Sequence, residues 1–118
     1  MKNFDISINL SQFERELINE VSKSEKLGLD WAKKDSIYKQ LDDFKKNILA
    51  KNTPNEGTEG HKERIALVSE EYERHLYGLS AAREDAEIAN VRYKASLAKL
   101  DALRTIMSNH REMVKRGL

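Results

Sequence analysis

The sequence predicts an all-α protein, a long antiparallel helical hairpin with coiled-coil (heptad) packing. Charged residues make up 35% of the 118 positions and hydrophobic residues 39%, which suits long helices that each bury one narrow stripe. The only proline and two of the five glycines lie within residues 52–60, a segment that cannot propagate a helix. An extended heptad repeat follows it. We therefore expect one helical domain over residues 1–118, with a first arm at about 11–51, a turn at 52–60 and a second arm at about 58–116.

The first ten residues predict a short extended segment ahead of the first arm. Apolar and polar residues alternate from Phe4 to Leu10, which is the two-residue period of a strand. Ser11 and Glu14 then have the spacing of a capping box, in which each side chain accepts a hydrogen bond from a backbone N–H at the start of a helix. The first helix is therefore expected to begin at Ser11.

The first arm carries an apolar stripe whose gaps are mostly three, four or seven residues. Such spacing places the stripe on one face of a helix. Its members are Leu10, Phe13, Leu17, Val21, Leu27, Trp31, Tyr38, Leu41, Phe44 and Ile48.

The second arm carries the strongest periodic signal. Two interleaved series, each with a step of seven residues, predict a continuous helix with a left-handed supercoil. One series is Ile65, Tyr72, Leu79, Ala86, Tyr93, Leu100, Met107 and Val114, and the other is Val68, His75, Ala82, Ala89, Ser96, Leu103 and His110. The three alanines among them would let another helix approach closely.

The charge distribution predicts how the arms pair. Net charges are −2 for residues 1–30, +3 for 31–51, −5 for 52–87 and +5 for 88–118. Folding back at the turn brings complementary blocks together, which favours an antiparallel hairpin. The second arm is longer, so about its last 20 residues are expected to be uncovered. Their apolar members are Leu100, Leu103, Ile106, Met107, Met113 and Val114. Either the N-terminal segment or a second subunit would cover them, and we expect a homo-oligomer.

No pattern for catalysis, for a cofactor or for a metal site is present. The sequence has no cysteine, no glycine-rich phosphate loop and no His-Glu-x-x-His spacing. His75 and His110 occupy heptad positions, where a polar residue that sets register or a pH-sensitive contact is expected. No apolar stretch approaches the ~20 residues of a membrane span, and the start of the chain does not resemble a signal peptide. We therefore expect a cytoplasmic protein that is not an enzyme.

A basic tail is the one patch that points to a ligand. Its members face only Asp101 and Glu112 as local acidic residues. They could pair with Glu14, Glu16 or Glu20, or with another subunit, or they could bind nucleic-acid phosphates without sequence preference. The tail consists of Arg92, Lys94, Lys99, Arg104, Arg111, Lys115 and Arg116.

Two blocks of sequence carry a resemblance. Trp31-Ala-Lys-Lys-Asp-Ser-Ile-Tyr-Lys-Gln-Leu41, continued by Lys45-Lys-Asn-Ile-Leu-Ala-Lys51, and Asn90-Val-Arg-Tyr-Lys-Ala-Ser-Leu-Ala-Lys-Leu-Asp-Ala-Leu-Arg104 resemble small helical proteins encoded by tailed phages. The first block is also similar to phage recombination mediators, which are oligomeric non-enzymatic proteins that bind single-stranded DNA and load a recombinase.

The resemblance to mediators covers about a fifth of the chain, and Lys51 alone stands for the basic Lys-x-Arg element of that family. It implies that Lys45, Lys46 and Lys51 join the basic tail as DNA contacts. The host cytoplasm would be the location, and single-stranded DNA, a recombinase or another phage protein would be the partner. The alternative is a structural coiled-coil adaptor or scaffold that binds only protein.

Overall fold

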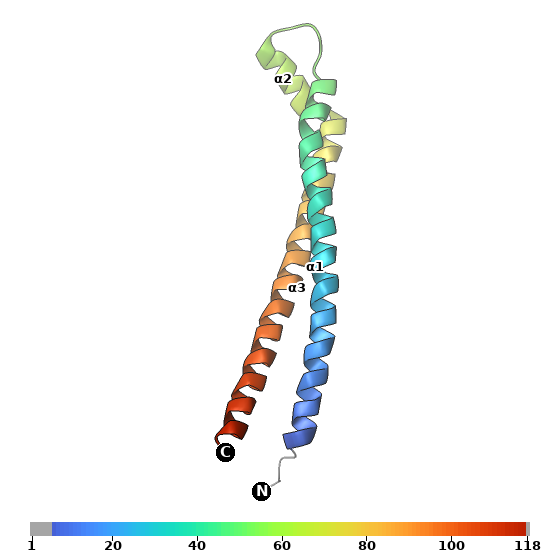
Figure 1. The fold of residues 1–118 in the computed structure, drawn as a ribbon. Coiled ribbons are helices and arrows are strands. Elements are labelled where there is room, and N and C mark those ends of the chain that lie inside the picture. Colours follow the sequence, from blue (N-terminus) through green and yellow to red (C-terminus); the bar gives the residue numbers. More distant parts are fainter. Residues whose placement is uncertain (1–5, 118) are drawn as a thin grey trace. The chain divides into compact units, whose positions relative to one another are not determined.

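Three α-helices make up nearly all of the chain that the computed structural model describes, which is residues 6–117 for the backbone and 11–117 for the side chains. They are α1 (Ile6–Lys51), α2 (Glu59–Leu67) and α3 (Glu70–Lys115) (Figure 1). No strand occurs within residues 6–117. The all-α helical hairpin is thus confirmed.

The first helix begins earlier than predicted. α1 starts at Ile6, so the extended segment is wrong for residues 6–10, and residues 1–5 lie outside the described residues. Ser11 lies inside the helix and does not cap it. The physical reason is that the spacing of Ile6, Leu10, Phe13 and Leu17 continues the helical stripe of α1 backward, which outweighs the local alternation.

A short helix follows the turn. Residues 52–58 contain no helix, and Thr58 caps α2 by accepting a hydrogen bond from the His61 backbone N–H at 3.3 Å. Gly57 has a φ of 113°, a left-handed conformation that favours glycine. The only proline, Pro54, lies in this stretch.

The predicted second arm is two helices, because the chain breaks at Val68 and Ser69. The Ser69 hydroxyl accepts a hydrogen bond from the Tyr72 backbone N–H at 3.2 Å and donates one to the Ala66 carbonyl at 2.9 Å. Ser69 therefore both terminates α2 and caps the N-terminus of α3. Three glutamates in the first turn of α3 also suit the positive end of the helix dipole.

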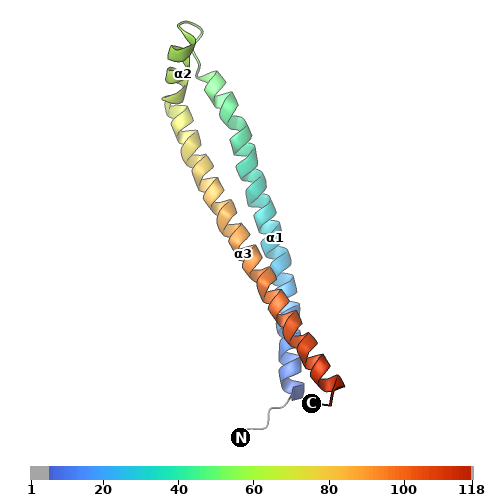
Figure 2. The same ribbon diagram turned by 90° about the vertical axis from the view of Figure 1, so that its left-hand side faces the viewer.

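The chain packs as two compact units. Unit 1 is residues 1–29 with 90–118, and unit 2 is residues 30–89. Within each unit, a part of α1 lies beside a part of α3 and runs in the opposite direction (Figure 2). The units differ in charge: unit 1 has eleven basic and seven acidic residues, net +4, and unit 2 has ten and thirteen, net −3.

The heptad positions of α3 are confirmed from Tyr72 to His110. Every predicted position in that range is buried or half-buried, and Ala86 and Ala89 are 5% and 1% exposed. The prediction is wrong at both ends. Ile65 and Val68 are exposed because the break at Ser69 ends the repeat, and Val114 is exposed near the end of α3.

The buried face of α1 is more polar than predicted. Val21 and Phe44 are exposed, at 37% and 57%, so their assignment to the stripe is wrong. Several flanking positions, among them Glu16, Asp35 and Leu49, are half-buried. The positions that form the helix contact, all buried or half-buried, follow a strict alternation of four and three residues. They are Phe13, Leu17, Glu20, Ser24, Leu27, Trp31, Lys34, Tyr38, Leu41, Lys45 and Ile48.

Of the six apolar residues predicted to be uncovered at the end of the second arm, three are covered. Leu100, Leu103 and Met107 are buried, and only Ile106, Met113 and Val114 of that set are exposed. Two features account for the correction: α1 extends back to Ile6, and α2 removes nine residues from the second arm. α1 and α3 consequently have the same length, 46 residues.

Candidate functional site

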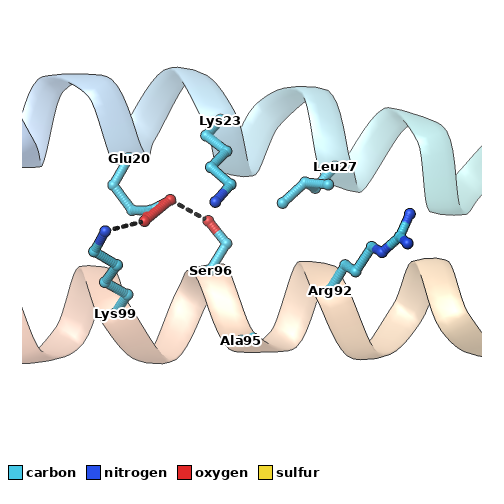
Figure 3. A pocket seen from close by; sticks show the side chains of 7 residues that line it. All are labelled: Glu20, Lys23, Leu27, Arg92, Ala95, Ser96 and Lys99. Atoms are coloured by element: carbon cyan, nitrogen blue, oxygen red, sulfur yellow. Dashed lines mark hydrogen bonds and ion pairs between the residues drawn. The ribbon is translucent and has the colours of Figure 1, made fainter.

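A buried carboxylate lies at the centre of unit 1. Glu20 of α1 is 3% exposed. Its Oε2 accepts a hydrogen bond from the Ser96 hydroxyl of α3 at 2.8 Å, and its Oε1 forms an ion pair with the Lys99 ammonium at 3.2 Å (Figure 3). Since a buried charge needs both a counter-charge and hydrogen bonds, the site satisfies the requirements for an ionised glutamate.

Its surroundings lower the pKa of Glu20. The largest cause is the hydrogen bond from Ser96, and the hydrogen bond and charge of Lys99 act in the same direction. The positive charge of Lys23 adds to them, whereas burial alone would raise the pKa. The carboxylate is therefore ionised at neutral pH.

Small residues bring the two helices close beside this carboxylate. Ser24, one turn after Glu20, is buried and donates a hydrogen bond to the Val21 carbonyl at 3.0 Å. Gly28 lies against Tyr93, and a Cβ at Gly28 would come within 3.1 Å of that ring. Glycine thus leaves the space that the tyrosine ring occupies.

A groove of about 460 Å³ opens along this flank of unit 1. Leu27 and Ala95 supply apolar surface, and three cations project around it (Figure 3). Its lining is Glu20, Lys23, Leu27, Arg92, Ala95, Ser96 and Lys99. With three basic groups and one carboxylate, the groove carries a net positive charge.

The cations of the predicted basic tail are exposed on α3 and on the residues just after it, all within unit 1. Among the described residues, Lys99 alone of the seven has an ion-pair partner. Arg92 and Lys99 each directly precede a heptad position, whereas Arg104 and Arg111 each directly follow one. The two pairs therefore lie on opposite flanks of the helix contact.

The three lysines of the first block have different surroundings, and all belong to unit 2. Lys45 is half-buried at a heptad position of α1, and Lys46 is exposed. Lys51 forms an ion pair with Glu71 at 3.0 Å, and Asn52 also donates to Glu71 at 3.2 Å. Lys51, unlike Lys46, therefore already has an acidic partner among the described residues.

The histidines do not assemble a metal site. The His75 Nε2–H donates a hydrogen bond to the Leu41 carbonyl at 2.7 Å, and His110 is half-buried. Among the described residues, no three His, Asp or Glu side chains are grouped so that they could hold a metal ion.

Glu20 is among the possible ion-pair partners of the basic tail that the sequence predicts, and its pair with Lys99 confirms that alternative for one of the seven cations. Sequence reasoning did not identify Glu20 as a buried residue or Lys23 as a neighbour of the tail. A search for apolar residues selected Val21, the neighbour of the buried position. The strict heptad step of seven from Phe13 leads to Glu20 and then to Leu27, so the signal was present.

Comparison of the chain with protein families, with curated proteins and with solved structures finds no match. None of the helices within residues 6–117 combines the length and the apolar character required to cross a bilayer.

Proposed function

We propose that the protein is a non-enzymatic, oligomeric phage accessory of DNA metabolism that binds single-stranded DNA through unit 1, in the manner of a recombination mediator. The host cytoplasm is its proposed location, and a recombinase is the proposed protein partner. The resemblance of residues 31–51 and 90–104 to phage proteins supports this origin.

The observation that carries the proposal is the separation of charge. Unit 1 has a net charge of +4, and six of its seven tail cations have no ion-pair partner among the described residues. Exposed, unpaired cations along a helix are free to replace the counterions of a phosphate backbone. Tyr93 lies at the helix contact and is half-buried, so binding would depend on charge more than on base stacking.

The direct test is a titration of the protein with fluorescent single-stranded and duplex DNA at about 50 and about 200 mM salt. We expect binding of single strands whose affinity falls as salt rises. Absence of binding at the lower salt concentration would reject the nucleic-acid function.

Replacing Arg104 and Arg111 together with glutamine is expected to weaken single-strand binding. Each lost phosphate contact lowers the slope of log affinity against log salt by about 0.7, so the double variant should lose about 1.4. The matched control is Arg15→Gln with Lys26→Gln, which removes two exposed cations of α1. Equal slopes for the two double variants would show that Arg104 and Arg111 make no phosphate contacts, and circular dichroism checks that both remain helical.

The second candidate is a coiled-coil adaptor that binds only protein. Ile106, Met113 and Val114, which are 43%, 52% and 61% exposed, favour it because they present apolar surface near the end of α3.

The predicted homo-oligomer can be tested by measuring whether the protein self-associates in solution. We expect sedimentation at micromolar concentration to give a species larger than the 13.6 kDa chain, because association would cover Ile106, Met113 and Val114. Met113→Glu should shift the distribution toward the monomer, and Glu112→Gln, at an exposed neighbour, should not. A parent protein that sediments only as the monomer would refute oligomerisation.

A further inference from the structure

The same heptad positions carry an ion pair in unit 2 and two lysines in unit 1. In unit 2, Lys51 of α1 lies across from Glu71 of α3 and forms an ion pair at 3.0 Å. Stepping four heptads back along α1 leads to Lys23, and stepping four heptads forward along α3 leads to Lys99. The equivalent place in unit 1 therefore brings two lysines together, an arrangement that by itself opposes pairing of the helices.

The buried Glu20 balances one of these two lysines. It forms its ion pair with Lys99, and its second oxygen accepts the hydrogen bond from Ser96. Lys23 lies close enough for its charge to act on Glu20, but forms no ion pair among the described residues. Arg92, one heptad before Lys99, also has no acidic partner there.

Lys23 and Arg92, the two of these cations without an ion-pair partner among the described residues, line the same groove. Figure 3 shows Lys23 and Arg92 reaching from α1 and α3 into the space between the helices, on either side of Leu27. Leu27 and Ala95 give this part of the groove an apolar lining. A smaller hollow beyond Lys23 is lined by Glu16 and Asn19, which adds a second carboxylate on that side.

We propose that the groove is a phosphate-binding site, in which Lys23 and Arg92 bind phosphate groups on either side of Leu27 and the Glu20–Ser96–Lys99 cluster fixes the spacing of the two helices. A guanidinium binds two oxygens of a phosphate with a planar pair of N–H groups, and an ammonium binds a phosphate as a point charge. The groove volume of about 460 Å³ also admits the group attached to the phosphate.

The inference rests on the proposed function where the phosphate is that of a DNA backbone. A free phosphate or a phosphorylated small molecule would use the same chemistry. Two separate measurements distinguish these sources, and both use the full chain. The variants are Lys23→Gln with Arg92→Gln and, as the charge-matched control, Arg15→Gln with Lys26→Gln.

The first measurement follows backbone amide resonances during titration with inorganic phosphate, with sodium chloride as the ionic-strength control. We expect saturable shifts at Lys23, Leu27, Arg92 and Ser96 in the parent and in the control variant, and none in the groove variant. The second measurement is the affinity for an oligodeoxythymidine of about 30 nucleotides. At about 50 mM salt, loss of two phosphate contacts should weaken the groove variant on the order of 10- to 100-fold, and the control much less.

The results separate the two hypotheses. Saturable phosphate shifts without DNA binding would support the groove and reject the nucleic-acid function. DNA binding that both double variants weaken equally, with no saturable phosphate shifts, would overturn the groove and leave the proposed function in place. If neither phosphate nor DNA binds the parent, both are rejected.

Discussion

Leu103→Ala is expected to lower the free energy of unfolding by about 2–5 kcal/mol, the range for truncating a buried leucine. Leu103 is 5% exposed at a heptad position of α3 in unit 1. The cost combines the lost burial of the side chain with the cavity that the neighbouring residues fail to fill. Urea unfolding at a fixed protein concentration, followed by circular dichroism, measures it.

Leu97→Ala is the matched control for this prediction. Leu97 lies six residues earlier in the same helix and is 41% exposed. Its truncation removes the same atoms from a more solvent-exposed position, so we expect the free energy of unfolding to fall by about 1 kcal/mol or less. If Leu97→Ala destabilised the protein as much as Leu103→Ala does, the heptad assignment of α3 would be wrong in unit 1.

The heptad assignment was predictable because α3 follows a single physical rule over most of its length. From Tyr72 to His110, the side chains that pack against α1 recur every 3.5 residues, and this spacing is visible without knowledge of the partner helix. The rule does not depend on the residues being apolar. Ser96 lies in the series and is buried, as the spacing predicts.

The same rule failed at Ser69 because periodicity is insensitive to capping. Ile65 and Val68 keep the apolar spacing, yet both are exposed. The hydrogen bonds of Ser69 to the helices on either side decide where α2 ends and α3 begins. The sequence does contain a signal for a helix start here, a serine followed by two glutamates. This short signal is weaker evidence than a continuous heptad repeat that runs through it.

The candidate site was less predictable than the fold because its central residue is stabilised from far along the chain. Glu20 and its hydrogen-bond donor Ser96 are 76 residues apart. A glutamate in a polar helix is ordinarily taken as exposed, and only the pairing of α1 with α3 shows that it is buried. The basic residues Arg92 and Lys99 could be identified from the sequence, but only that pairing shows that they line one groove together with Lys23.

Ser96→Ala is expected to lower the free energy of unfolding at neutral pH by about 1–3 kcal/mol. The substitution keeps a small side chain at the helix contact but removes the hydroxyl that donates to Glu20 at 2.8 Å. The carboxylate would then be buried with Lys99 as its remaining partner. Ser108→Ala, at an exposed position of α3, is the control and should stay within about 0.5 kcal/mol of the parent. Equal unfolding midpoints for both variants would show that the hydrogen bond contributes nothing to stability.

The same cluster predicts how stability depends on pH. The pKa of Glu20 is lower in the folded protein than its ordinary value of 4.5, mainly because of the hydrogen bond from Ser96 and then that of Lys99. The unfolded chain therefore binds a proton more readily, so the contribution of Glu20 is complete above pH 4.5 and is lost as pH falls through the folded pKa. Glu20→Gln removes the titrating group and should flatten the decline of stability in this acidic range. Glu25→Gln, an exposed position of the same helix, should leave the decline unchanged. Urea midpoints measured at intervals from neutral to acidic pH compare the three proteins, and a Glu20→Gln profile parallel to that of the parent would contradict the role of Glu20 as a buried, ionised group.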